Sequence, residues 1–235
     1  LDDNKILTLA NGDRIPMTDN VKLLFEVEDL RNASPATVSR AGVIFVSDTD
    51  LNWSPIVESW LQRKADGIQQ LLHKLILKYI GDCNSLNPSG HLFQFIGRNT
   101  HPVMNIARVG YMQQWTHLMD GLLECVDLSS SSAALESELQ RMVLFALIWT
   151  VGSLLEHEDR HALHEYLASL EDPNLPQSDN PQTLYDYWVN PDSSDWEPWP
   201  MPKWEYPTQH HGLVSFHSLL VPTVDTARTN ILIQQ

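Results

Sequence analysis

The chain has 235 residues, and its 30 acidic and 15 basic side chains give a formal net charge of −15 at pH 7. The basic residues form no cluster, which argues against nucleic acid as a partner. There is no signal peptide and no apolar run of about 18 residues, so the sequence predicts no membrane span. The length suits one large domain or two small ones, with enough residues to bury a core.

Two further features bear on the compartment and on completeness. The two cysteines, Cys83 and Cys125, are far apart in apolar surroundings, which is typical of buried, reduced thiols in a cytosolic protein rather than of a disulfide framework. The sequence begins with Leu1 instead of Met, in the middle of a pattern. We therefore expect it to be a piece of a longer protein.

The first predicted elements are a β-hairpin and a strand. Residues Ile6–Leu9 and Arg14–Pro16 flank the turn Asn11-Gly12-Asp13, and Asn-Gly between apolar residues is the strongest short-range hairpin signal. The apolar run Val21–Val27 then predicts a strand.

A short helix and another strand follow at S-P-A-T-V-S-R-A-G, residues Ser34–Gly42. The Ser34 hydroxyl can cap a helix, and Pro35 suits the first helical position. Gly42 ends the helix, and Val43–Val46 predicts a buried strand.

Arg40 stands at the end of this short helix and has two interpretations. An exposed guanidinium there can bind a phosphate of a neighbouring module through its planar fork. It can equally be a surface cation that is favourable at a helix C-terminus. The residues alone favour the second interpretation.

From Asn52 onward, apolar residues recur with the period of α-helices. The predicted helical faces lie in Trp53–Leu61, Ile68–Ile80, Met104–Val126, Leu135–Leu154 and Arg160–Leu170, with a polar break at Asn84–Gly90. These stripes indicate a packed core rather than a cofactor site.

The remaining chain changes in composition. Glu171–Gly212 holds most of the prolines and predicts an irregular connector that is ordered by the tryptophans Trp188, Trp196, Trp199 and Trp204. Val214–Gln235 contains an apolar run and then a new helix. This last piece is expected to start another module.

The segment His157-Glu158-Asp159-Arg160-His161 matches H-E-x-x-H. On a helix, His157 and His161 would share a face and could bind zinc, with Glu158 activating water, as in a zinc-dependent hydrolase. The charged surroundings and the position of the next histidine, His164, fit neither common zincin pattern. A solvated polar helix start is the favoured interpretation. The pair His210-His211, in a proline-rich loop, is a weaker candidate.

No other motif carries catalytic chemistry. The sequence contains no G-x-x-x-x-G-K-[ST] phosphate loop, no G-x-S-x-G elbow and no paired cysteine ligands. Taken by itself, it predicts a mixed α/β and then α-helical chain without a complete active site.

Nearly the whole chain resembles the dynein heavy chain. The resemblance is carried by Leu1–Ile15, Leu23–Leu30 and Ser34–Gly42, which look like the second AAA+ module of the motor ring. Leu144–Gly152 looks like its helical lid, and Val221–Arg228 resembles the entry to the third module. The tryptophan-rich run after Ser54 and the form of the lid look more like axonemal, outer-arm-type chains than cytoplasmic dynein.

The resemblance implies a mixed fold. Residues 1–46 would be the C-terminal part of an α/β AAA+ large subdomain, and 47–170 a mainly α-helical lid subdomain. Residues 171–213 would be the irregular Trp/Pro-rich connector, and 214–235 the start of the third AAA+ module.

The resemblance also implies a function that belongs to the ring. Six AAA+ modules would couple turnover of ATP, with Mg²⁺, to minus-end-directed movement along microtubules. Arg40 matches the arginine finger offered in trans to the nucleotide of the first module. Glu26 falls at a sensor position where a hydrolysing module usually carries Asn, and an ionised carboxylate cannot donate a hydrogen bond to a phosphate. Ala41 replaces the Cys that is most often seen after the finger.

The implied partners are the neighbouring AAA+ modules of the same heavy chain and, through the parent protein, microtubules and other dynein subunits. The implied location is the cytoplasm and cytoskeleton, in the axoneme of a cilium or flagellum. The phosphate loops would lie before Leu1 and after Gln235, so we expect this piece alone to hold neither nucleotide nor metal and to be inactive.

Overall fold

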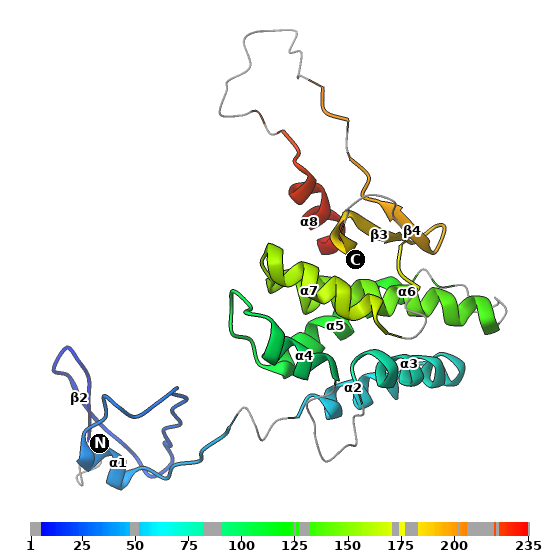
Figure 1. Ribbon diagram of the computed structural model, residues 1–235. Helices are drawn as coiled ribbons and strands as arrows, with labels where there is room; N and C mark the ends of the chain where they lie inside the picture. Colours follow the sequence, from blue (N-terminus) through cyan, green and yellow to red (C-terminus); the bar gives the residue numbers. More distant parts are fainter. Residues whose placement is uncertain are drawn as a thin grey trace. The chain divides into compact units, whose positions relative to one another are not determined.

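The computed structural model describes residues 6–47, 52–81, 91–124, 126, 132–170, 174–176, 183–201, 203–205, 219 and 221–234. Two units are separated between Ser47 and Asp48, and each is described by itself (Figure 1).

The first unit contains a hairpin and one short helix. Strands β1 (Ile6–Thr8) and β2 (Arg14–Pro16) pair antiparallel with Leu7 opposite Ile15. The turn between them uses Gly12, which has a φ of +90° that favours glycine. The hairpin predicted from Asn-Gly is therefore present. Helix α1 (Pro35–Arg40) follows and buries none of its residues.

The two strands predicted at Val21–Val27 and Val43–Val46 are not formed, and this part of the prediction is wrong for the chain as described. Both segments are non-helical and pair with no strand among the described residues. A strand needs neighbours for its backbone N–H and C=O groups, and β1 and β2 pair only with each other. As a result, apolar side chains predicted to be buried are exposed, among them Leu24 (97%) and Ile44 (87%).

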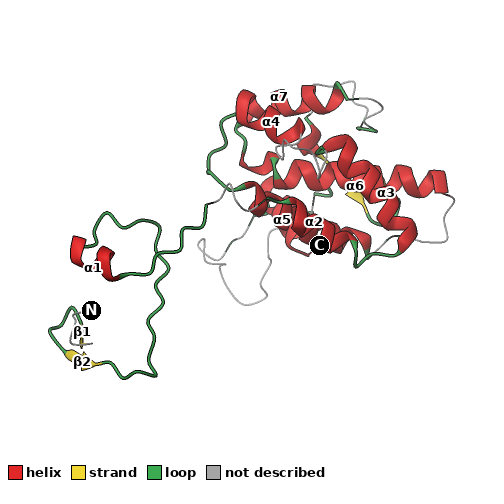
Figure 2. Cartoon of the chain, turned by 90° about the horizontal axis from the view of Figure 1, so that it is seen from below, coloured by secondary structure: helices red, strands yellow, loops and turns green. Residues whose placement is uncertain are grey.

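The second unit is a bundle of helices with a small hairpin (Figure 2). Its helices are α2 (Ser54–Leu61), α3 (Asp66–Tyr79), α4 (His91–Asn99), α5 (Arg108–Leu123), α6 (Ser132–Thr150) and α7 (His157–Ala168), with a 3₁₀ turn η1 (Gly152–Leu154) between the last two. Helix α4 was not predicted, although Leu92, Phe93 and Ile96 give it a short apolar face that is buried.

Helix α6 lies at the centre of the bundle and packs against α3, α5 and strands of the hairpin. Its apolar residues were predicted to form one stripe. In the structure every residue from Met142 to Ile148 is buried, because neighbours cover this part of the helix on all sides. Hydrogen bonds between polar side chains also join the helices of the bundle. Tyr79 on α3 accepts from Gln140 on α6, and Lys64 and Trp60 both donate to Asp120 on α5.

The hairpin consists of β3 (Tyr187–Asn190) and β4 (Asp195–Pro198), paired antiparallel with Val189 opposite Trp196. A 3₁₀ turn, η2 (Leu184–Asp186), leads into it. Ser194 in its turn has a φ of +53° and is held on α6, because Arg141 donates to its carbonyl oxygen (2.6 Å) and its hydroxyl donates to the buried Glu138. The hairpin is thus fixed on the central helix at its tip.

Aromatic side chains join the hairpin to the helices. Trp199 contacts Trp149 of α6 edge-on at 5.4 Å and stacks on Trp188 of β3 at 5.9 Å. Trp196 meets Phe145 edge-on at 6.2 Å. Part of the segment predicted to be an irregular connector, residues 183–200, is therefore a regular hairpin in the same core as the helices.

The last described element is α8 (Val224–Gln234). It begins at a local cap, in which Thr226 N–H donates to the Thr223 hydroxyl and Thr223 N–H to the Thr226 hydroxyl. Ala227 is buried, and Ile231 and Leu232 pack partly against the core. In the described part of the chain, no helix combines the length and apolar character needed to cross a bilayer.

Candidate functional sites

Arg40 lies in the last turn of α1 and is exposed. The local structure is that predicted from the sequence: the Ser34 hydroxyl accepts from Thr37 N–H at 3.2 Å, Pro35 occupies the first turn, and the helix ends at Ala41. A guanidinium at the end of a short, capped helix is held near the surface, where its planar fork can bind an oxyanion.

Glu26 lies in an extended segment without regular secondary structure and is exposed. Glu26 belongs to the predicted strand Val21–Val27 and, by resemblance, to a sensor position. Because that strand is not formed here, the described residues leave Glu26 without the backbone pairing that would orient it.

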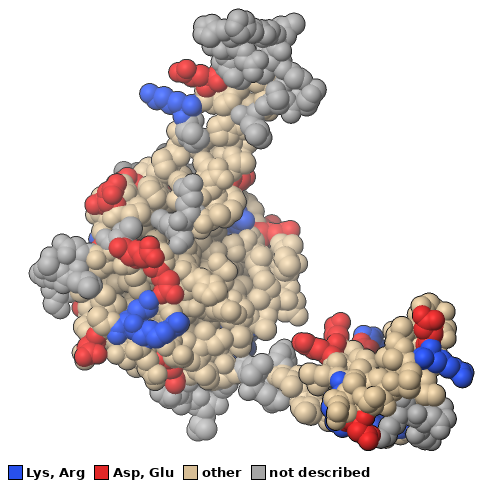
Figure 3. All heavy atoms as spheres, turned by 180° about the vertical axis from the view of Figure 1, so that it is seen from behind, with Lys and Arg blue, Asp and Glu red and all other residues tan. Residues whose placement is uncertain are grey.

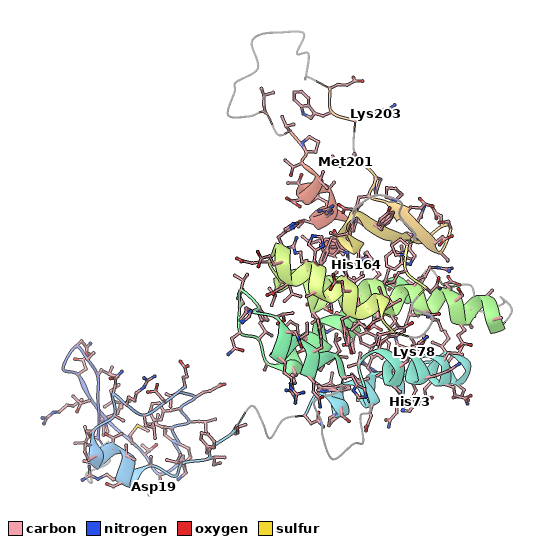
Figure 4. The ribbon with its side chains drawn as sticks, in the orientation of Figure 1. Asp19, His73, Lys78, His164, Met201 and Lys203 are labelled. Carbon is pink, nitrogen blue, oxygen red and sulfur yellow. The ribbon has the colours of Figure 1, made fainter. Side chains whose placement is uncertain are left out.

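The H-E-D-R-H segment begins α7 at His157, as the polar-helix interpretation predicted. The rings of His157 and His161 are both exposed and lie 4.7 Å apart, nearly perpendicular. His164, labelled in Figure 4, has a buried Nδ1 without a partner among the described residues. An open hollow of about 560 Å³ beside His157 has an aliphatic floor that includes Val103 and Leu154.

Among the residues that the structure describes, no third metal ligand is grouped with these histidines. Across the described ranges, no three His, Cys, Asp or Glu side chains are grouped so that they could hold a metal ion. His210 and His211 lie outside the described residues. The remaining charged members of the segment have structural contacts: Asp159 accepts from His101 N–H at 2.6 Å, and Arg160 donates to the carbonyl oxygen of Leu155 at 2.7 Å.

Arg160 also connects the start of α7 to the 3₁₀ turn η2. Its guanidinium lies 4.8 Å from the centre of the Tyr185 ring, and the Tyr185 hydroxyl donates to the carbonyl oxygen of Gly152 at 2.9 Å. Trp199 donates through its indole nitrogen to the carbonyl oxygen of Tyr185, also at 2.9 Å. Burial raises the pKa of Tyr185 well above its usual value, so this phenol is neutral and acts as a donor.

The residue after Tyr185 holds helix α8. Asp186 accepts from the guanidinium of Arg228 at 2.8 Å through Oδ1, while Oδ2 accepts from the backbone N–H and the hydroxyl of Thr183 at 2.9 and 3.1 Å. Arg228 also reaches Asp225, one turn earlier in α8, at 3.4 Å. We call Thr183, Asp186 and Arg228 the α8 seat. It joins elements that are about forty residues apart in the sequence.

Several of the other charged side chains form pairs of opposite sign. On the face of the chain drawn in Figure 3, Lys and Arg side chains lie next to Asp and Glu side chains. Examples among the described residues are the pair Lys74–Glu136, at 2.5 Å, and the pair Lys64–Asp120.

Comparison with known proteins identifies the helical unit. Residues 72–201 match the family described as the dynein heavy chain AAA lid domain. This range begins within α3 and includes α4, α5, α6, α7 and the hairpin. The chain belongs to the dynein heavy chain family. The helical unit of this dynein chain therefore contains an AAA lid domain.

Curated relatives align along almost all of this dynein chain. It is 38% identical to dynein axonemal heavy chain 8 of Homo sapiens, over 99% of this chain and 5% of that protein. It is 40% identical to dynein axonemal heavy chain 5 of Rattus norvegicus, over 100% and 6%. The dynein gamma chain of the flagellar outer arm of Chlamydomonas reinhardtii is 35% identical, over 99% and 5%. The chain thus spans about a twentieth of the length of these relatives.

The α8 seat was not predicted, although its local signals are present in the sequence. Thr183-x-x-Asp186 has the spacing of a capping box, and Asp225-x-x-Arg228 has helical i, i+3 spacing. What the sequence does not contain is the pairing of the two motifs, because the contact between Asp186 and Arg228 depends on where the hairpin places η2.

Proposed function

We propose that this chain is part of the motor ring of an axonemal dynein heavy chain, an ATP-driven, minus-end-directed microtubule motor of cilia or flagella. The axonemal and flagellar names of the aligned relatives support this location. In this proposal, the chain runs from the second AAA+ module through its lid into the third. Its partners are the neighbouring modules and, through the whole heavy chain, microtubules and the other dynein subunits.

Within the ring, the helical unit would transmit nucleotide-dependent closure from one module to the next. The observation that carries this proposal is the contact of α8 with the lid: Arg228 bonds to Asp186, and Ala227 is buried. By resemblance, α8 lies at the entry to the third module. A lid that holds this helix through a directional contact can pass its rotation on to the next module.

The first unit would be the C-terminal part of the large subdomain of the second module. Its exposed runs Val21–Val27 and Val43–Val46 have the composition of buried strands. We propose that they pair with strands supplied by the rest of that subdomain. Glu26 would then be fixed at the sensor position, where an ionised carboxylate disfavours hydrolysis because it cannot donate a hydrogen bond to a phosphate.

ATP and Mg²⁺ would be held by other parts of the ring. The described residues contain no grouped metal ligands, and the sequence has no phosphate loop. We expect the separate chain to bind ATP poorly and not to hydrolyse it, because no backbone cradle or loop lysine is present for the phosphates. Isothermal titration calorimetry with Mg²⁺ and ATP tests this, and micromolar affinity for the separate chain would contradict it.

Arg40 is proposed as the arginine finger for the nucleotide of the first module. In the full heavy chain, Arg40→Ala should lower microtubule-stimulated ATP turnover by about 10³-fold, as fingers do in related phosphoryl-transfer enzymes. Arg40→Lys should rescue little because an ammonium lacks the bidentate fork. Folding should hardly change, since α1 buries none of its residues.

The matched control is Arg31→Ala, which removes another exposed arginine of the same unit, one that pairs locally with Asp29. Its ATP turnover should equal that of the unsubstituted heavy chain. Normal turnover in Arg40→Ala, together with a small loss of melting temperature, would instead assign Arg40 to a local stabilising role at the helix end.

A further inference from the structure

Helix α8 is attached to the lid by a small contact in which one ion pair has a large share. Among the described residues, the apolar side chains of α8 that are buried or packed on the core are those of Ala227, Ile231 and Leu232, and Ile233 is 77% exposed. Arg228, in contrast, has a side chain that is only 14% exposed. The orientation of α8 therefore depends strongly on the position of the carboxylate that receives Arg228.

That carboxylate is not free to rotate. Oδ2 of Asp186 accepts hydrogen bonds from two donors of Thr183, the backbone N–H and the hydroxyl. The bond from the backbone N–H is one half of a capping box, and in the other half the Thr183 side chain accepts from the backbone N–H of Asp186. With Oδ2 fixed, Oδ1 points to a defined place, where it meets Arg228 at 2.8 Å. Among the described residues, Thr183 itself makes no hydrogen bond to α8.

The turn that carries Asp186 is itself fixed on the helices. Tyr185 is buried and donates to Gly152, and Trp199 donates to the carbonyl oxygen of Tyr185 and through its backbone N–H to that of Asp186. A contact of this kind loses little side-chain entropy when it forms, because the acceptor is already held in its bound geometry.

We propose that Thr183 is a positioning residue for helix α8, acting through Asp186. Its capping bonds orient the carboxylate so that Arg228 is received in one direction, and this sets the direction in which the chain leaves the lid. The role of this contact in the motor rests on the transmission between modules that is proposed above. The geometric relation among the three residues does not depend on that proposal.

The docking of Arg228 should be sensitive to the position of the Asp186 carboxylate. Nε of Arg228 is buried and has no hydrogen-bond partner among the described residues. A buried guanidinium that is only partly paired retains part of its desolvation cost. Small displacements of Asp186 should therefore weaken the docking of α8 more than they would weaken an exposed ion pair.

The test is hydrogen–deuterium exchange of the full 235-residue chain, followed separately in peptides from α8, α6 and β3. Arg228→Ala should raise the opening constant of α8 about tenfold or more, since hydrogen bonds to charged groups are the stronger class. Thr183→Ala should raise it about fivefold, although Thr183 does not bond to α8. Thr183→Ser, which keeps the hydroxyl, should remain near the unsubstituted value.

The decisive variant is the double substitution Thr183→Ala with Arg228→Ala. If Thr183 acts through Asp186 on Arg228, the double variant should open α8 no more than Arg228→Ala alone, within about twofold. If Thr183 only stabilises the turn, the two effects should multiply to about fiftyfold, because independent contributions add in free energy. Multiplication, or an unchanged α8 in Thr183→Ala, would overturn the proposal.

Asp186→Asn tests whether α8 can open while the hairpin stays folded. A side-chain amide has one oxygen and cannot accept from Thr183 and Arg228 on opposite sides, so α8 should open while β3 and α6 stay protected. Protection of α8 equal to that of the unsubstituted chain in Asp186→Asn would also overturn the proposal. Lys74→Ala, which breaks a pair between α3 and α6, is the control and should leave α8 unchanged. No nucleotide or microtubule is used, so an unchanged ATPase in Arg40→Ala would not affect this result.

Discussion

The hydroxyl of Tyr185 donates a 2.9 Å hydrogen bond to the carbonyl oxygen of Gly152, 33 residues earlier in the chain. Gly152 opens the 3₁₀ turn between α6 and α7, and Tyr185 lies in the turn that leads into the hairpin. Both residues are buried. This bond therefore fixes the hairpin side of the lid to the point where its two C-terminal helices change direction.

Gly152→Ala should destabilise the lid by about 1–3 kcal/mol, the usual cost of overpacking. A methyl group at this position would overlap the Tyr185 hydroxyl and lie 2.8 Å from Cδ2 of Leu163. Urea denaturation followed by tryptophan fluorescence measures the change. Gly97→Ala in α4 is the control: nothing lies within 4 Å of the new methyl group, so stability should rise by about 0.5–1 kcal/mol. Equal effects of both changes would rule out the close approach at Gly152.

Tyr185→Phe should lower stability at neutral pH by about 1–3 kcal/mol, because the buried carbonyl oxygen of Gly152 loses its donor. Tyr166→Phe is the matched control, since the Tyr166 hydroxyl is buried without a partner in the described ranges. Removing that hydroxyl should be neutral or slightly stabilising. A loss in Tyr166→Phe as large as that in Tyr185→Phe would show that the hydrogen bond to Gly152 is not the cause.

At alkaline pH, the ionisation of Tyr185 should lower the free energy of unfolding. Burial raises the pKa of Tyr185 in the folded chain above the value of about 10 that applies when the chain is unfolded. The unfolded state then releases its proton first, so the free energy of unfolding should fall as the pH rises above about 10. The fall should be smaller in Tyr185→Phe. It should not vanish, because burial also raises the pKa of Tyr111 and of Tyr166. Denaturation curves between pH 8 and 11 in steps of about half a unit provide the measurement.

At acidic pH, Asp120 should contribute to the pH dependence of the free energy of unfolding. Its burial acts to raise the pKa, but the hydrogen bonds from Lys64 and Trp60 outweigh this effect, so the pKa is lowered. The stabilisation is present above the usual pKa of about 4 and should be lost as the pH falls toward the lower, folded-state value. Asp120→Asn should thus differ from the unsubstituted chain by less than about 1 kcal/mol at neutral pH, given a half-exposed carboxylate. The difference should shrink below about pH 4, and a difference that grows on acidification would contradict the assignment.

How far the sequence predicts the structure depends on the range of the interactions involved. The Asn-Gly hairpin, the Ser34 cap before Pro35 and the apolar face of α3 are local patterns, and all are present in the structure. Helix α4 was missed because its nine residues carry only three buried apolar side chains, too few for a clear period. The strand at Val43–Val46 was predicted from composition. Composition reports an affinity for burial, but pairing requires neighbours that the described residues do not supply.

In the candidate sites, too, local patterns could be predicted and long-range contacts could not. Arg40 could be placed at a helix end from the capping and stop signals around it, whereas the role proposed for it depends on groups of another module. The aromatic residues of 183–200 indicated an ordered segment, but not that Trp196 and Trp199 would meet Phe145 of α6. The α8 seat combines two local motifs that a long-range contact brings together, and spacing alone gives no information on that contact.

The separation of the two units gives the last prediction. In the described ranges, every buried side chain lies between Trp53 and Ala227, and none of residues 6–47 is buried. A chain shortened to residues 48–235 should therefore keep the cooperative unfolding and the stability of the helical unit, to within about 0.5 kcal/mol, because none of the described residues that the deletion removes is buried. The deletion removes the exposed apolar side chains of Leu24, Ile44 and Phe45, so solubility should improve. Urea denaturation and sedimentation velocity of both chains measure the two effects. A loss of several kcal/mol on deletion would mean that residues 1–47 complete the core of the lid, and the division of the chain at Ser47 would then be wrong.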